Sequence, residues 1–172
     1  MANLRDIKRR ISSIQSTQKI TSAMKMVAAA KLRRATDAIH AARPYAERMR
    51  ATLEEVAGAS ADVQHPLFEQ REEKKHLELL VITSDRGLAG AFNSAVLKVA
   101  DAYLAEHGQD FENIGITIIG KKAADYYKRR RPSQISESRP VGPNVNYLEA
   151  QQVASMLMKR LEDGHVDPVA LV

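Results

Sequence analysis

The sequence predicts an α/β protein in which a long N-terminal helix precedes a small Rossmann-like parallel sheet with flanking helices. Two observations lead to this prediction. From Leu4 to Val56 the apolar residues recur at alternating steps of three and four, which is the spacing of a helix that packs along one seam. From Leu77 onward, short β-branched runs alternate with helical stretches, as they do in parallel α/β sheets.

The predicted N-terminal helix needs a partner. Extended through Val56 it would be roughly 80 Å long at about 1.5 Å per residue, too long to bury its own seam against a small domain. The seam is apolar at both ends and polar in between, at Gln18, Thr21 and Lys25. Pro44 lies off the seam, so we expect it to kink or weaken the helix locally without ending it.

The change of period divides the chain. We expect a long coiled-coil helix over residues 1–57, a connecting loop over 58–76, and a Rossmann-like α/β domain over 77–172. Gly58 is a natural helix terminator. Inside the domain we expect strands over 77–83, 114–119 and 166–172, helices over 92–106, 121–130 and 147–162, and a loop between the last two helices. Because the sequence stops in or near the third strand, we infer a truncated chain whose missing part holds a second long helix.

Composition narrows the function classes. The chain has 172 residues, no cysteine and a net charge of +5, so disulfides, thiolate catalysis and cysteine-ligated metals are excluded. Residues 1–50 carry a net charge of +9 and the remainder −4. A basic rod on a mildly acidic body favours an anionic partner, whether nucleic acid, acidic lipid or acidic protein, although a solvated helix face is the better explanation of such a charge run taken alone. The sequence has no apolar run near the roughly 18 residues that a membrane-spanning helix requires.

The strand-to-helix turn after residue 83 invites comparison with phosphate-binding turns. Its spacing matches neither the dinucleotide fingerprint nor the P-loop, so we interpret it as a structural turn. The residues of this turn are Ser84, Asp85, Arg86, Gly87 and Gly90.

Other residues offer little chemistry. The five histidines are scattered without metal-ligand spacing, and no nucleophile elbow is present, so we expect no metal, no cofactor and no catalytic residue. The basic cluster from Lys128 to Arg131 has only Tyr126 and Tyr127 as aromatic neighbours, and we interpret it as a solvated helix end rather than a nucleic-acid site.

Three runs of sequence carry a family resemblance. They are IKRRISSIQSTQKITSAMKMVAAAKLRRA at 7–35, RPYAERM at 43–49 and SDRGLAGAFN at 84–93. Together they resemble the gamma subunit of F-type ATP synthase, whose chains are longer and end in a second long helix. One departure is GLAG, where many relatives have GLCG.

The resemblance implies a rotor. In that family the N- and C-terminal helices form an antiparallel coiled coil inside a ring of alpha and beta subunits, and the globular part meets the epsilon subunit and the c-subunit ring. Proton-driven rotation of the shaft changes the conformation of the catalytic beta subunits. The subunit itself is then non-catalytic, with no nucleic-acid partner and no direct insertion into the membrane, and it lies peripherally at the cytoplasmic face of a bacterial inner membrane.

Under this resemblance, the most characteristic run supplies the residues that contact the beta subunits. They are Arg9, Arg10, Lys19, Met24 and Lys25.

Two alternative functions remain. One is a coiled-coil nucleic-acid-binding protein that uses the basic helix, and the other is a nucleotide-dependent enzyme that uses the α/β domain.

Overall fold

The computed structural model describes residues 3–59, 67, 75–142 and 145–172. The chain divides into two compact units, residues 1–63 and 64–172. The α/β fold class predicted from the sequence is confirmed: one long helix belongs to the first unit, and a four-stranded parallel sheet with flanking helices forms the second. Most of the predicted connecting loop, 58–76, lies outside the described residues.

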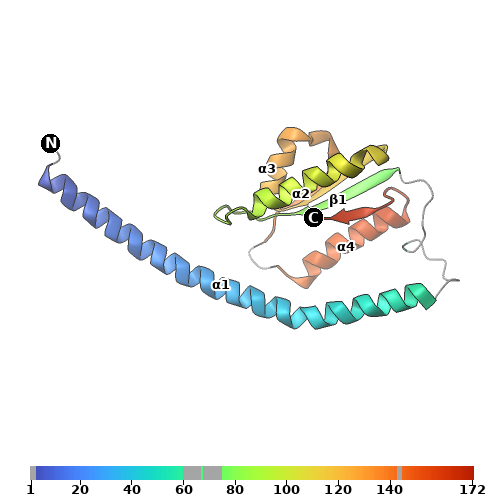
Figure 1. The fold of residues 1–172 in the computed structure, drawn as a ribbon, viewed down its shortest axis with the longest axis horizontal. Helices are drawn as coiled ribbons and strands as arrows, with labels where there is room; N and C mark the ends of the chain where they lie inside the picture. Colours follow the sequence, from blue (N-terminus) through green and yellow to red (C-terminus); the bar gives the residue numbers. More distant parts are fainter. Residues whose placement is uncertain (1–2, 60–66, 68–74, 143–144) are drawn as a thin grey trace. The chain divides into compact units, whose positions relative to one another are not determined.

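The first unit is the single helix α1, Leu4–Ala59, 56 residues long. Gly58, the expected terminator, is itself helical, since one glycine costs only about 1 kcal/mol in a helix. Pro44 lies inside α1 without interrupting it, and Figure 1 shows the helix axis changing direction in its C-terminal third. Residues 3–58 are all exposed, including the apolar seam positions.

The second unit is built on the parallel sheet β3-β2-β1-β4. Its strands are β1 (His76–Ile82), β2 (Asn113–Ile119), β3 (Ile135–Arg139) and β4 (Val169–Leu171). The helices α2 (Phe92–His107) and α3 (Lys121–Arg130) cover one face, and α4 (Tyr147–Glu162) covers the other (Figure 1). Two short 3₁₀ turns, Gly108–Asp110 and Pro132–Gln134, follow α2 and α3.

The core lies between the sheet and the α2/α3 layer. Alternate residues of β1 and β2 point into it because side chains in a strand alternate between faces. The buried cluster comprises Leu77, Leu79, Val81, Leu97, Ala100, Leu104, Ile116, Ile118, Ala123, Ala124 and Tyr127.

The opposite face of the sheet holds a buried carboxylate. Glu78 on β1 accepts hydrogen bonds from Thr117 Oγ1 (2.5 Å) on β2, Ser136 Oγ (3.0 Å) on β3 and Arg160 Nη1 (3.3 Å) on α4. Because a buried charge is tolerated only when it is paired and hydrogen-bonded, this network specifies how α4 sits on three strands. Gly115 leaves room for it, since a Cβ there would lie 2.2 Å from Glu78 Oε2.

One strand departs from the sequence prediction. Residues 135–139 were expected in the loop after α3, but they form β3, parallel to β2 at the edge of the sheet. A short edge strand carries polar side chains at alternate positions and lacks the apolar run that marks a buried strand. The strand predicted over 166–172 is the fourth, and it begins only at Val169 because Asp167 accepts the N–H groups of Lys75 and His76 and Pro168 has no N–H.

Gly120, between β2 and α3, provides a stability test. It has φ of 106°, and a Cβ there would lie 2.1 Å from the carbonyl oxygen of Thr83. Gly120→Ala should therefore lower the free energy of unfolding by at least about 2 kcal/mol, measured by urea denaturation followed by circular dichroism. Gly87→Ala is the matched control, because its Cβ meets nothing within 4 Å; a change above about 0.5 kcal/mol in the control, or below it in Gly120→Ala, would contradict the assignment.

Candidate functional site

The predicted turn lies at the carboxyl end of β1, where it faces the start of α3. Asp85 Oδ1 accepts hydrogen bonds from the N–H groups of Lys121 (2.9 Å) and Val141 (3.0 Å). Thr83 Oγ1 accepts from the N–H of Ala123 (3.0 Å), and Ser84 O accepts from the N–H of Lys122 (3.2 Å). The chain's own oxygens thus occupy the N-terminus of α3, the position at which such folds hold an anion.

The other side of the turn is fixed to α2. The N–H of Ser84 donates to Asn93 Oδ1 (3.0 Å), and Ser84 Oγ donates to the carbonyl of Arg86 (2.6 Å). Leu88 and Gly90 both have left-handed backbones, with φ of 64° and 57°. These hydrogen bonds favour the interpretation of Ser84, Asp85, Arg86, Gly87 and Gly90 as a structural turn.

Asp85 has a perturbed pKa. Partial burial acts to raise it, but the two backbone N–H donors and the positive charges of Lys121 and Arg86 outweigh burial and leave the pKa of Asp85 below its ordinary value of 3.8. The carboxylate is therefore ionised in the folded protein through the neutral range and into acid.

A second cluster joins α2 to α3, and sequence reasoning did not anticipate it. Asp101 on α2 accepts hydrogen bonds from the hydroxyls of Tyr126 and Tyr127 on α3, the latter at 3.1 Å. The hydrogen bond to Asp101 and then burial raise the pKa of Tyr126, while burial and then the Asp101 charge raise the pKa of Tyr127. Both phenols remain protonated donors well above neutral pH. The sequence carried little indication of this cluster, because Asp101 is 25 residues from Tyr126 and 26 from Tyr127.

The predicted partner-contact residues all lie on α1. Arg9, Arg10, Lys19, Met24 and Lys25 are exposed, Met24 to 56%. They do not share one face: at about 100° per residue, Lys19, Met24 and Lys25 are separated by roughly 100° to 140° around the helix axis. Thr17 and Thr21 bond their own helix, each Oγ1 donating to the carbonyl four residues earlier at 2.9 and 3.0 Å. A partner that contacts all five residues must surround the helix.

Within the described ranges, no group of three histidine, cysteine, aspartate or glutamate side chains is placed to hold a metal ion. Among the helices that the structure describes, none combines the length and hydrophobicity needed to cross a lipid bilayer.

Comparison with known proteins decides the family. The sequence matches the family described as ATP synthase over residues 3–172. The chain belongs to this family. Two relatives are the ATP synthase gamma chains of Desulforamulus reducens, 42% identical over 172 residues, and Anaeromyxobacter sp. (strain Fw109-5), 44% identical over 174. The resemblance to the gamma subunit is confirmed.

The relatives are longer. The match covers 100% and 99% of this chain but 59% and 60% of these two ATP synthase gamma chains. The nucleic-acid alternative finds no support in the family or in these relatives.

Solved structures agree with the fold. A chain of the central stalk and c-ring of Tetrahymena thermophila mitochondrial ATP synthase superposes with a TM-score of 0.68 at 27% identity, covering 88% of this chain and 63% of that one. A chain of the Euglena gracilis mitochondrial ATP synthase rotor gives 0.52 at 22% identity, covering 97% and 55%, which shows the fold alone.

The pKa of Asp85 predicts how the turn responds to acid. Because that pKa is lowered on folding, the carboxylate stabilises the fold above pH of about 4 and loses its contribution as pH falls through the lowered value. Asp85→Ala should therefore lower the urea midpoint at about pH 7, and the difference from the unsubstituted protein should shrink towards about pH 2.5. Asp125→Ala, an exposed acid on α3, is the control and should leave the midpoint close to that of the unsubstituted protein. A difference for Asp85→Ala that stays constant with pH would disprove the role of the carboxylate.

Proposed function

We propose that the chain is part of the central-stalk gamma subunit of an F-type ATP synthase. The subunit couples proton-driven rotation of the membrane ring to conformational change in the catalytic beta subunits, which make ATP. Family membership over residues 3–172 and the gamma chains among the relatives support this role. The observation that carries it is α1: a basic helix of 56 residues, exposed along its length.

The exposure of α1 supports a surrounded shaft. The seam residues Leu4, Ile7 and Ile11 are 67%, 44% and 51% exposed, and a coiled-coil partner would remove them from water. In the proposal that partner is the subunit's own C-terminal helix, which lies in the part of the relatives that this chain does not span. Basic residues elsewhere on the circumference remain free to face acidic segments of the surrounding alpha and beta subunits.

The middle of the seam is the proposed working surface. Gln18, Thr21 and Lys25 interrupt the apolar pattern at the level of Lys19 and Met24. Exposed ion pairs contribute only about 0.2 to 1 kcal/mol each and are screened by salt. Weak and interchangeable contacts of this kind suit a shaft that must move from one beta subunit to the next.

In this proposal the second unit contacts the epsilon subunit and the c-subunit ring. The subunit contributes no catalytic residue and no cofactor site, and it lies peripherally at the cytoplasmic face of a bacterial inner membrane. The turn at Ser84, Asp85, Arg86, Gly87 and Gly90 keeps a structural role, since it fixes α2 and α3 to the end of β1.

Co-purification tests the proposal. The full-length gene product, expressed with the alpha and beta subunits of the same organism and treated with nuclease, should co-purify with both. Arg9→Glu/Arg10→Glu should lower the yield of the complex roughly fivefold, because replacing attraction by repulsion costs about 1 kcal/mol or more. Arg43→Glu/Arg48→Glu, with the same change of charge farther along α1, is the control and should retain the complex. Absence of alpha and beta subunits from the unsubstituted preparation would refute the proposal.

A further inference from the structure

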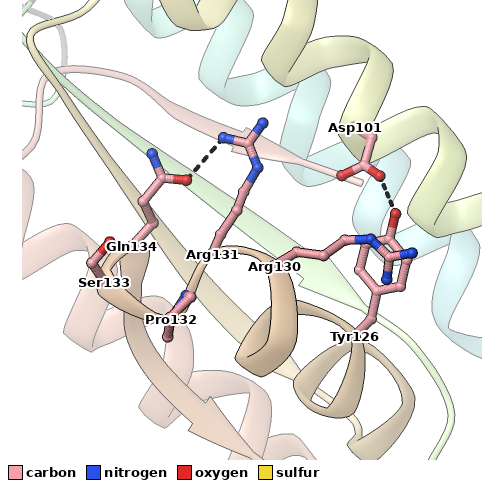
Figure 2. Close-up of a pocket in the computed structure, with 7 residues that line it drawn as sticks. All are labelled: Asp101, Tyr126, Arg130, Arg131, Pro132, Ser133 and Gln134. Atoms are coloured by element: carbon pink, nitrogen blue, oxygen red, sulfur yellow. Dashed lines mark hydrogen bonds between the residues drawn. The ribbon is translucent and has the colours of Figure 1, made fainter.

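A hollow of about 630 Å³ lies at the C-terminal end of α3. It is distinct from the turn and from α1. Its lining residues are Asp101, Tyr126, Arg130, Arg131, Pro132, Ser133 and Gln134 (Figure 2). This volume is within the range of pockets that hold small ligands.

The ring of Tyr126 holds Arg130 in place. Its guanidinium carbon lies 3.9 Å from the centroid of the Tyr126 ring, so the two planar groups form a cation–π contact. Among the residues that the structure describes, no carboxylate forms an ion pair with Arg130 or Arg131. Both guanidinium groups therefore retain donors and a positive charge for another group.

Asp101, the acidic residue of the hollow, is already engaged. It lies opposite the Tyr126 hydroxyl, as Figure 2 shows, and it accepts hydrogen bonds from Tyr126 and Tyr127 rather than from an arginine. This arrangement fixes the Tyr126 ring, and the ring in turn positions Arg130. The carboxylate thus organises the hollow without pairing with its cations.

Arg131 is positioned from the other side. Its Nη1 donates to Gln134 Oε1 (3.0 Å), and its side chain points towards Gln134 in Figure 2. The backbone N–H of Arg131 donates to the carbonyl of Tyr127 (2.8 Å), and the backbone N–H of Gln134 donates to the carbonyl of Arg131 (3.1 Å). The backbone and the side chain of Arg131 are both held by hydrogen bonds, so little conformational entropy would be lost when a ligand binds.

A favourable interaction with the helix dipole does not account for this arrangement. Cations near a helix C-terminus stabilise its last carbonyl groups, and Arg129 Nε does donate to the carbonyl of Asp125 (3.1 Å). Arg131 is the C-cap residue of α3, but its guanidinium donates to Gln134 Oε1, and the Arg130 guanidinium lies over an aromatic ring. These two side chains line a hollow instead of capping the helix.

We propose that this hollow binds a phosphate-bearing anion, with Arg130 and Arg131 as its charged ligands. The planar fork of arginine matches phosphate oxygens in pairs. The exposed side chains of Lys128 and Arg129 lie beside the hollow in sequence and raise the local concentration of anions. The phosphate can belong to a soluble phosphate compound or to the headgroup of an acidic phospholipid. The site does not depend on the proposed rotor function.

The test uses the full 172-residue chain and two probes. Isothermal titration with inorganic pyrophosphate measures the soluble anion, and co-sedimentation with phosphatidylglycerol vesicles, against phosphatidylcholine vesicles, measures the headgroup. Arg130→Gln/Arg131→Gln should weaken binding of at least one probe by about tenfold, since two charge-assisted contacts are lost. Arg33→Gln/Arg34→Gln on α1 is the matched control, being an adjacent exposed pair with the same change of charge.

The outcomes separate the two sources. Loss of pyrophosphate binding in the hollow variant alone supports a soluble phosphate compound, and selective loss of vesicle binding supports the lipid headgroup. Equal weakening in both variants would show non-specific charge attraction and overturn the proposal, as would failure of the unsubstituted chain to bind either probe. Circular dichroism of both variants confirms that folding is retained, and Arg131→Lys, which keeps the charge and loses the fork, should bind with intermediate affinity.

Discussion

Burial of the apolar seam of α1 is the interaction on which the proposed role of this protein depends. Along a helix of 56 residues the large apolar side chains are exposed, and each square ångström of such surface contributes about 25 cal/mol when it leaves water. A helix of this length cannot bury its own seam. The partner helix and the surrounding subunits of the proposed shaft would supply that burial.

The α/β unit obtains its stability differently. Its main core is a layer of apolar side chains between the sheet and the helices α2 and α3. On the other face of the sheet, the hydrogen bonds of the buried Glu78 carboxylate hold α4 in place. In the sheet order β3-β2-β1-β4, successive strands are added on one side of β1 and then on the other, so the topological switch point lies between β1 and β4. Related folds bind nucleotides at this point. Asp85 and Thr83 follow β1 and accept N–H groups at the N-terminus of α3, the helix that comes after β2. These hydrogen bonds lock the turn between β1 and β2.

Much of this fold could be predicted from the sequence, because buried parallel strands and amphipathic helices have strong periodicities. The bounds of α3 and α4 agree with those predicted, and β1 and β2 differ by single residues. β3 was missed because an edge strand need not be apolar. The Asp101 cluster and the basic hollow were also beyond prediction, since they depend on how α2 packs against α3. The contact residues were named from the family resemblance, and their roles remain proposals.

In the proposed assembly, the alpha and beta subunits enclose α1 on all sides. Residues 1–172 contain no cysteine, so Lys19→Cys, Met24→Cys and Lys25→Cys can each be labelled with a maleimide once any cysteine elsewhere in the full-length subunit is replaced by serine. In the free 172-residue chain all three should react at similar rates, because the positions are exposed. In the complex with alpha and beta subunits, all three should react more slowly, on the order of tenfold, although they face different directions. Protection of one face with another left fully reactive would contradict an enclosed shaft.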